Sequence, residues 1–195
     1  MTYVQTETAE GEAAKQATCR HTGIRHVGLH AANPVASAEF YKAVLGMEVV
    51  GGSGADHPLG ASVFLSSNPN EESHEVALFA STAFVHVAFK VSSLAEFRSF
   101  HARVVEKNIP IKAVFNHRAS FAFYFDDPDG NTIEVYWPTG DLSWRQPQAE
   151  PLDLSQPDEA ILPKIVRGQS RYLSGAGSFG VTREISRQWP GALNR

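Results

Sequence analysis

The chain has 195 residues, 43% of them apolar, which is enough for one domain of ordinary size with a hydrophobic core. A formal net charge of −4 excludes the basic footprint of a nucleic-acid-binding protein, and no run reaches the roughly 18 apolar residues that a membrane span needs. The single cysteine, Cys19, excludes an intramolecular disulfide, and the polar start lacks the apolar core of a secretory signal, so we expect a cytoplasmic protein.

The chain begins with a polar segment, and we predict that residues 1–21 are a disordered leader because they offer little to bury. Order is predicted to begin with a short strand over Ile24–His30. Side chains alternate between the two faces of a strand, so His26, Gly28 and His30 share one face.

A helix and three strands follow in the first half of the chain. The helix is predicted over Val35–Leu45, with Ala36, Phe40 and Val44 near helical spacing as its apolar stripe and Gly46 as its C-cap. The three strands are predicted at 47–50, 61–66 and 74–79.

The same order of elements restarts at residue 84 with a strand over 84–91. Ser93 is a predicted N-cap, and Glu96 three residues later completes a capping box for a helix over Leu94–Lys107. Its predicted buried face comprises Leu94, Phe97, Ala102 and Val105. Three more strands are predicted at 111–115, 121–125 and 132–137.

The two halves also resemble each other in sequence, since HVGL at 26–29 corresponds to HVAF at 86–89. This internal duplication predicts two βαβββ modules, at about 24–80 and 84–138. Each module has one apolar sheet face. We therefore predict an α+β fold in which the paired modules form one curved mixed sheet around a cavity.

The composition changes after Pro138, where prolines become frequent and hydrophobic periodicity weakens. We interpret residues 141–195 as a C-terminal extension that packs on the body or on a partner subunit. Short helices are predicted near 158–166 and 181–189. Three aromatic residues are predicted to anchor the extension: Trp144, Tyr172 and Trp189.

Three residues at matching places in the duplicated scaffold carry metal-binding chemistry: His26, His86 and Glu134. Taken singly, a strand glutamate more often faces solvent, and a histidine is more often structural. A carboxylate between Ile133 and Val135 is costly to bury, however, unless a cation meets it. Two imidazoles and one carboxylate suit Fe(II), or Mn(II), and leave further coordination positions open.

Four segments, taken in order, resemble the vicinal-oxygen-chelate superfamily: HVGL, FYKAVLGMEVV, HVAF and DPDGNTIEVYW. That superfamily includes glyoxalases, fosfomycin- and bleomycin-resistance proteins and type I extradiol dioxygenases. The resemblance covers about residues 22–140. It implies paired βαβββ modules around a metal cavity, with His26, His86 and Glu134 as ligands, and it implies a homodimer.

Further residues resemble one branch of that superfamily. Glyoxalase-like members place a fourth ligand in the last strand of the first unit, where Ala77 aligns with Glu134 and cannot bind a metal. His74, His117 and Tyr124 are similar to the residues beside the metal in extradiol dioxygenases. The sequence departs from that branch in the short separation between His117 and Tyr124.

The resemblance implies an Fe(II)-dependent extradiol dioxygenase that opens a catechol-type ring and inserts both atoms of O2. His74 would be the acid–base group, and Tyr124 and His117 would bond the two diol oxygens. The expected partners are an aromatic diol and O2, with no nucleic acid and no membrane. Two alternatives stay open: a glyoxalase-like isomerase or transferase, and a ligand-sequestering resistance protein. Basic residues that could meet a substrate carboxylate are Arg25, Lys90 and Arg118.

Overall fold

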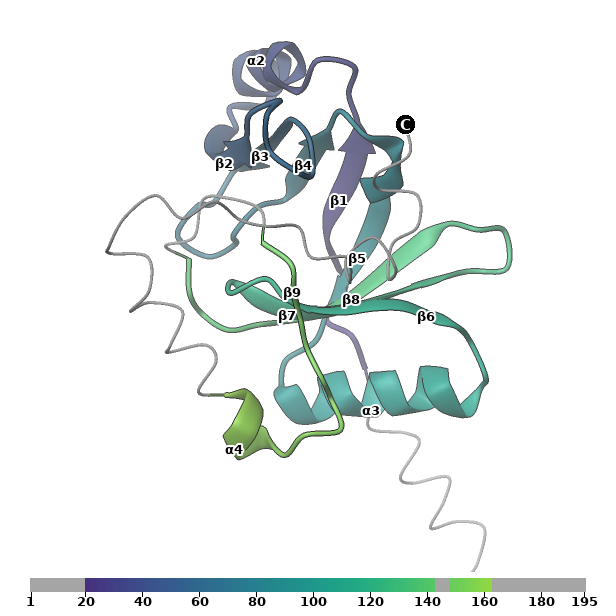
Figure 1. Cartoon of the computed structure of the whole chain (residues 1–195). Helices are drawn as coiled ribbons and strands as arrows, with labels where there is room; N and C mark the ends of the chain where they lie inside the picture. Colours follow the sequence, from purple (N-terminus) through teal and green to yellow (C-terminus); the bar gives the residue numbers. More distant parts are fainter. Residues whose placement is uncertain (1–19, 143–147, 163–195) are drawn as a thin grey trace, which may run out of the picture.

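A computed structural model describes residues 20–142 and 148–162, and in this part of the chain nine strands form one sheet (Figure 1). The strands are β1 (Ile24–His30), β2 (Glu48–Ser53), β3 (Ser62–Ser66), β4 (Val76–Phe79), β5 (His86–Lys90), β6 (Ile111–Asn116), β7 (Ser120–Asp126), β8 (Thr132–Pro138) and β9 (Glu150–Pro151). The helices are α2 (Pro34–Leu45), α3 (Leu94–Glu106), α4 (Asp158–Ile161) and the 3-10 turn η1 (Thr82–Phe84).

The sheet has the order β2-β3-β4-β1-β5-β8-β7-β6-β9, which joins two βαβββ modules. In the first module β1 runs parallel to β4, and in the second β5 runs parallel to β8. An antiparallel pair of β1 and β5 joins the modules at the centre of the sheet. The predicted α+β fold of paired modules in one curved mixed sheet is therefore confirmed (Figure 1).

Side-chain caps define where the two long helices begin. At α3 the Ser93 hydroxyl accepts a hydrogen bond from the Glu96 amide at 3.1 Å, and the Glu96 carboxylate accepts one from the Ser92 amide at 2.9 Å. At α2 the Asn33 side chain accepts a hydrogen bond from the Ala36 amide at 3.1 Å. These caps satisfy amides that have no partner inside the helix.

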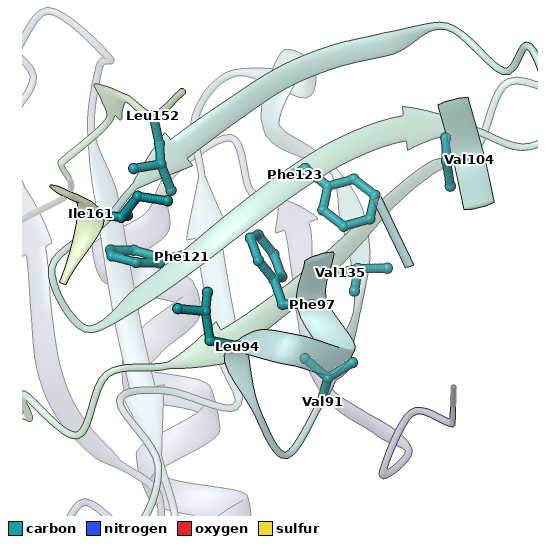
Figure 2. Close-up of a cluster of buried hydrophobic side chains, with 9 residues drawn as sticks. All are labelled: Val91, Leu94, Phe97, Val104, Phe121, Phe123, Val135, Leu152 and Ile161. Atoms are coloured by element: carbon teal, nitrogen blue, oxygen red, sulfur yellow. The ribbon is translucent and has the colours of Figure 1, made fainter. Parts of the chain in front are cut away.

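The main core lies between α3 and the strands of the second module (Figure 2). Leu94, Phe97 and Val104 from α3 pack on Phe121, Phe123 and Val135 of the sheet. The predicted inclusion of Ala102 and Val105 in the buried face is wrong, since Val105 is 52% exposed. Successive helical residues are rotated by about 100°, so a helix that turns Val104 inward turns its neighbours toward solvent.

The predicted apolar stripe of α2 does not face the core. Phe40 and Val44 are 61% and 60% exposed, whereas Pro34 and Ala38 are buried. Ala38 packs in the first-module core, where its small side chain lets the helix lie close to the sheet. The prediction that Ala36, Phe40 and Val44 form the inner face is therefore wrong.

Residues 148–162 run back over the second module after β8. β9 pairs with β6, and Leu152 and Ile161 are buried in the main core (Figure 2). Of the helix predicted near 158–166, the structure shows α4 (Asp158–Ile161), and residues 163–166 lie outside the described part of the chain.

Several predictions concern residues outside the described part of the chain. These are the leader up to residue 19, the helix near 181–189 and the three anchors Trp144, Tyr172 and Trp189. Among the described helices, none combines the length and the apolar character that a bilayer crossing requires.

We predict that Phe97→Ala lowers the free energy of unfolding by about 3–5 kcal/mol, because Phe97 is fully buried and its loss leaves a cavity. Phe40→Ala is the matched control and should change stability by no more than about 0.5 kcal/mol, because Phe40 already lies in solvent. Denaturant unfolding measures both values. Equal effects would contradict the assigned core.

Candidate metal centre and its cavity

His26, His86 and Glu134 meet at the centre of the sheet. They lie on the adjacent strands β1, β5 and β8 and are only 6%, 8% and 2% exposed. Their side chains share one face, where the modules join. The structure thus brings together three residues that are distant in sequence.

The three side-chain atoms that face one another form a nearly equilateral triangle. His26 Nε2 and His86 Nε2 are each 3.1 Å from Glu134 Oε2 and 3.2 Å from one another. Right-angled bonds of about 2.1 Å to a common ion would place ligand atoms about 3.0 Å apart, against about 3.4 Å for a tetrahedral ion. The three atoms therefore lie close enough together to bind one metal ion.

A backbone carbonyl fixes the orientation of His86. Its Nδ1 lies 2.7 Å from the carbonyl oxygen of Phe84, which can only accept, so Nδ1 carries the proton. In neutral His86 the bare Nε2 then faces a carboxylate oxygen of Glu134, and two acceptors oppose each other. A cation, either a proton or a metal ion, is required between them.

The pKa values show how the site holds its charge without a metal. Burial lowers the pKa of His86, but the hydrogen bond and charge of Glu134 outweigh it, and the pKa is raised. Burial raises the pKa of Glu134, but His26 and His86 outweigh it and hold this pKa well below its usual value. Glu134 is therefore ionised and ready to accept a cation.

Gly28 leaves open the space that the His86 side chain occupies. Gly28 lies opposite His86 in the pairing of β1 and β5, and an added Cβ would lie 2.5 Å from Nδ1 and Cε1 of His86 and 2.6 Å from the Phe84 carbonyl oxygen. Such separations are far below van der Waals contact. The glycine of the HVGL segment is thus needed for the position of the imidazole.

The two modules differ at one decisive position. Gly28 pairs with Ala77 in the first module, and Ala88 pairs with Glu134 in the second, so Ala77 occupies the place equivalent to Glu134. Ala77 is fully buried and offers no ligand atom. Within the described residues, the candidate site therefore has three protein ligands rather than four.

A cavity of ≈140 Å³ opens beside the triad, and most of its wall is apolar or aromatic. Both modules contribute to that wall, with Val50, Leu59, Phe64, Phe79, Phe84, Phe115, Ala119, Ala149 and Tyr136. His74, His117 and Tyr124 line the same cavity, so the three predicted catalytic residues lie beside the three predicted ligands.

His74 reaches the cavity from the loop before β4, not from the strand itself. Its ring stacks on Phe64 with centroids 5.0 Å apart, and lies 4.4 Å from the ring of His26. Burial, and next the electrostatic interaction with His26, lower the pKa of His74 well below its usual value. His74 is thus a neutral imidazole beside the triad, able to accept a proton.

His117 and Tyr124 meet despite their short separation in sequence. His117 follows β6, Tyr124 lies in β7, and a tight turn with Arg118 at φ 67° joins the strands. His117 Nε2 is 2.8 Å from the Tyr124 hydroxyl. Burial lowers the pKa of His117, and burial followed by the charge and hydrogen bond of Glu134 raises that of Tyr124, so the tyrosine keeps its one proton to donate to His117 or to Glu134.

The structure adds residues that the sequence analysis missed. Tyr136 is buried two positions after Glu134, a spacing that already placed both on one strand face. Gln148 and Ala149 reach the cavity from the C-terminal extension, for which no local pattern gave a signal.

The basic residues considered for a substrate carboxylate do not line the cavity in the described residues. Lys90 pairs with Glu72 at 2.6 Å, and Arg118, which is buried, lies 3.6 Å from Asp141. Arg25 is exposed. The cavity wall is therefore neutral apart from the triad and the histidines.

Paired βαβββ modules, with two histidines and a carboxylate facing a shared cavity, define a vicinal-oxygen-chelate scaffold. Residues 23–135 match the family model described as the Glyoxalase/Bleomycin resistance protein/Dioxygenase superfamily, and the chain belongs to this superfamily. The resemblance drawn from the sequence motifs is thereby confirmed.

Similar proteins include several dioxygenases. The chain is 30% identical over 112 residues to biphenyl-2,3-diol 1,2-dioxygenase 3 of Rhodococcus globerulus, a match that covers 51% of this chain and 55% of the relative. The structure of 2,2',3-trihydroxybiphenyl 1,2-dioxygenase from Sphingomonas wittichii matches with a TM-score of 0.54 at 22% identity, covering 66% of this chain and 48% of that one.

A glyoxalase has the same fold. The Mn(II)-bound glyoxalase from Novosphingobium aromaticivorans matches with a TM-score of 0.53 at 22% identity, covering 74% of this chain and 46% of that one. Matches at such low identity show the fold alone. The chain spans about half the length of the dioxygenases it matches.

Gly28→Ala should lower metal affinity on the order of tenfold or more although no ligand is changed, because the new methyl group displaces His86. Calorimetric titration with Mn(II) measures the affinity. Leu29→Ala, at an exposed position of the same strand, should bind metal normally. Unchanged affinity in folded Gly28→Ala would show that His86 does not hold the ion.

Metal binding should weaken as the pH falls. The raised pKa of His86 means that, below this pKa, a metal must displace a proton from the site, and affinity then falls about tenfold per pH unit. Calorimetry in buffers of different ionisation enthalpy counts the protons released. Affinity that stays constant from about pH 8 to pH 5 would contradict this proton–metal competition.

Proposed function

We propose that the chain is an Fe(II)-dependent extradiol dioxygenase that opens a catechol-type ring and inserts both atoms of O2. The observation that carries this proposal is the triangle of His26, His86 and Glu134, placed beside His74 and the His117–Tyr124 pair in one cavity. Dioxygenases among the similar proteins, one of them named for a biphenyl diol, support it.

His26, His86 and Glu134 would hold the Fe(II) ion, which would supply Lewis-acid and redox chemistry toward the diol and O2. Side chains of the cavity would accept and donate the protons. Neutral His74 lies beside the triad and can accept a proton from a substrate hydroxyl and return it later. Tyr124, which stays protonated, donates a hydrogen bond, and His117 Nε2 accepts one.

The cavity wall supports a narrower substrate class. Aromatic and aliphatic side chains surround the triad, and Lys90 and Arg118 are engaged in ion pairs outside the cavity wall. An aryl or alkyl group on the diol would bury apolar surface, whereas a carboxylate would lose water without gaining a partner among the described residues. We therefore propose a neutral diol with an apolar substituent.

The test is turnover. Protein loaded anaerobically with Fe(II) is mixed with air-saturated catechol, 3-phenylcatechol or 2,3-dihydroxybenzoate, and the visible absorbance of a yellow ring-fission product is followed. We expect product with the first two and a kcat/KM at least about tenfold lower with the carboxylate. No product from any of a varied set of diols would reject the proposal and favour an isomerase or a sequestering protein.

His74→Phe should keep the metal affinity but lower kcat by about 10²–10⁴-fold, because phenylalanine keeps the stacking on Phe64 and removes the proton acceptor. Oxygen uptake measures turnover, and metal analysis confirms loading. His30→Phe, at an exposed histidine of β1, is the control and should retain activity. Activity that survives in His74→Phe would remove His74 from the mechanism.

We also propose a homodimer and a cytoplasmic location. A homodimer is expected from the superfamily, and sedimentation of the purified chain would give its mass in solution. A cytoplasmic location is proposed from the single cysteine.

A further inference from the structure

Residues 148–162, which we call the C-terminal strap, touch both faces of the sheet. Ala149 packs in the cluster that contains Tyr124 and Tyr136, on the cavity side. Leu152 and Ile161 pack with Phe121 in the main core (Figure 2). The strap contributes β9, the edge strand next to β6, and neighbouring residues of a strand point to opposite faces of the sheet. The strap can therefore contact both faces.

We propose that the C-terminal strap is a positioning element of the site, which holds His117 in the tautomer that carries its proton on Nδ1 and leaves Nε2 as an acceptor. The contact that does this joins His117 Nδ1 to the backbone carbonyl oxygen of Gln148. The assignment of Nε2 as an acceptor for substrate rests on the proposed function. The tautomer itself does not.

The direction of these hydrogen bonds follows from the partner atoms. A carbonyl oxygen only accepts, so His117 Nδ1 must donate to Gln148. A neutral imidazole has one N–H, which leaves Nε2 as the acceptor for the Tyr124 hydroxyl at 2.8 Å. The ring of Phe115, 5.6 Å away by centroids, packs beside the imidazole.

The strap is attached to the strand that carries His117. β9 pairs with β6 through Phe115 opposite Pro151 and Asn116 opposite Glu150, and the Leu152 amide donates to the Val114 carbonyl at 3.0 Å. Gln148 thereby lies next to the end of β6, where His117 begins the turn.

Anchors remote from the cavity hold the strap in place. Leu152 is 5% exposed and Ile161 is fully buried. Arg98 on α3 donates hydrogen bonds to three strap acceptors: the Leu154 carbonyl at 2.5 Å, the Gln156 carbonyl at 2.6 Å and the Asp158 carboxylate at 2.8 Å. Loosening these anchors would release the Gln148 carbonyl without touching the cavity.

Release of the carbonyl would change what His117 offers. Nδ1 would lose the Gln148 carbonyl as its acceptor, and the proton would distribute over both ring nitrogens. In the molecules that carry it on Nε2, His117 would become a donor toward Tyr124 and could no longer accept from a substrate hydroxyl.

Long-range ¹H–¹⁵N NMR of the histidine rings tests the proposal in ¹⁵N-labelled full-length chain loaded with Zn(II), which is diamagnetic. The His117 signals are assigned by their loss in His117→Gln. We expect the Nδ1–H tautomer in the unsubstituted chain and a mixture of tautomers in Leu152→Ala. Zn(II) affinity should stay within about twofold, and kcat/KM for catechol in the Fe(II)-loaded variant should fall about tenfold, as for one lost orienting hydrogen bond.

Leu65→Ala is the matched control, because Leu65 is an equally buried leucine in the first-module core and should leave the tautomer unchanged. If Leu152→Ala does not fold, Arg98→Met replaces it, with Lys42→Met on α2 as its control for loss of an exposed ion pair. The His117 NMR signals report the tautomer in Leu152→Ala and in Arg98→Met alike, and both are strap variants in the sense that each loosens the strap.

An Nε2–H tautomer in the unsubstituted chain would overturn the proposal. A folded strap variant that keeps a single Nδ1–H tautomer would overturn it as well. Failure of the Fe(II)-loaded chain to turn over any diol would reject the proposed function but would leave the tautomer result standing. The two failures are therefore distinguishable.

Discussion

The ionised carboxylate of Glu134, almost wholly buried between two imidazole nitrogens, is the constraint on which the site depends. A charge in this position is costly to bury unless hydrogen bonds and a cation meet it. His86 cannot turn away, since the Phe84 carbonyl holds its other nitrogen and Gly28 leaves it just enough room. The centre of the sheet is thus built for a cation.

Duplication places two of the three candidate ligands at equivalent positions, and the third position differs between the modules. The same register in both modules puts His26 and His86 at equivalent positions, but Ala77 and Glu134 differ. His74 arrives from the first module and lines the cavity beside the triad. The candidate site thus has titratable side chains next to three ligand residues, where Ala77 offers no fourth.

The C-terminal strap combines two kinds of contact, one with the main core and one with the cavity. Its hydrophobic anchors, Leu152 and Ile161, stabilise the main core, while its backbone carbonyl at Gln148 bonds His117 at the cavity. Stability of the second module and the state of one cavity histidine are therefore linked through a single segment. For this reason we expect mutations in the main core, on the sheet face opposite the cavity, to affect His117.

By itself, the sequence determined the two modules, the βαβββ order and the strand positions of His26, His86 and Glu134, because alternation and duplication are local patterns. It failed at the exposed stripe of α2 around Phe40, since only tertiary packing decides which side of a helix is covered. Likewise, the meeting of Gln148 with the cavity depends on a backbone atom of a distant segment. No side-chain pattern encodes such a contact, so only the tertiary structure decided it.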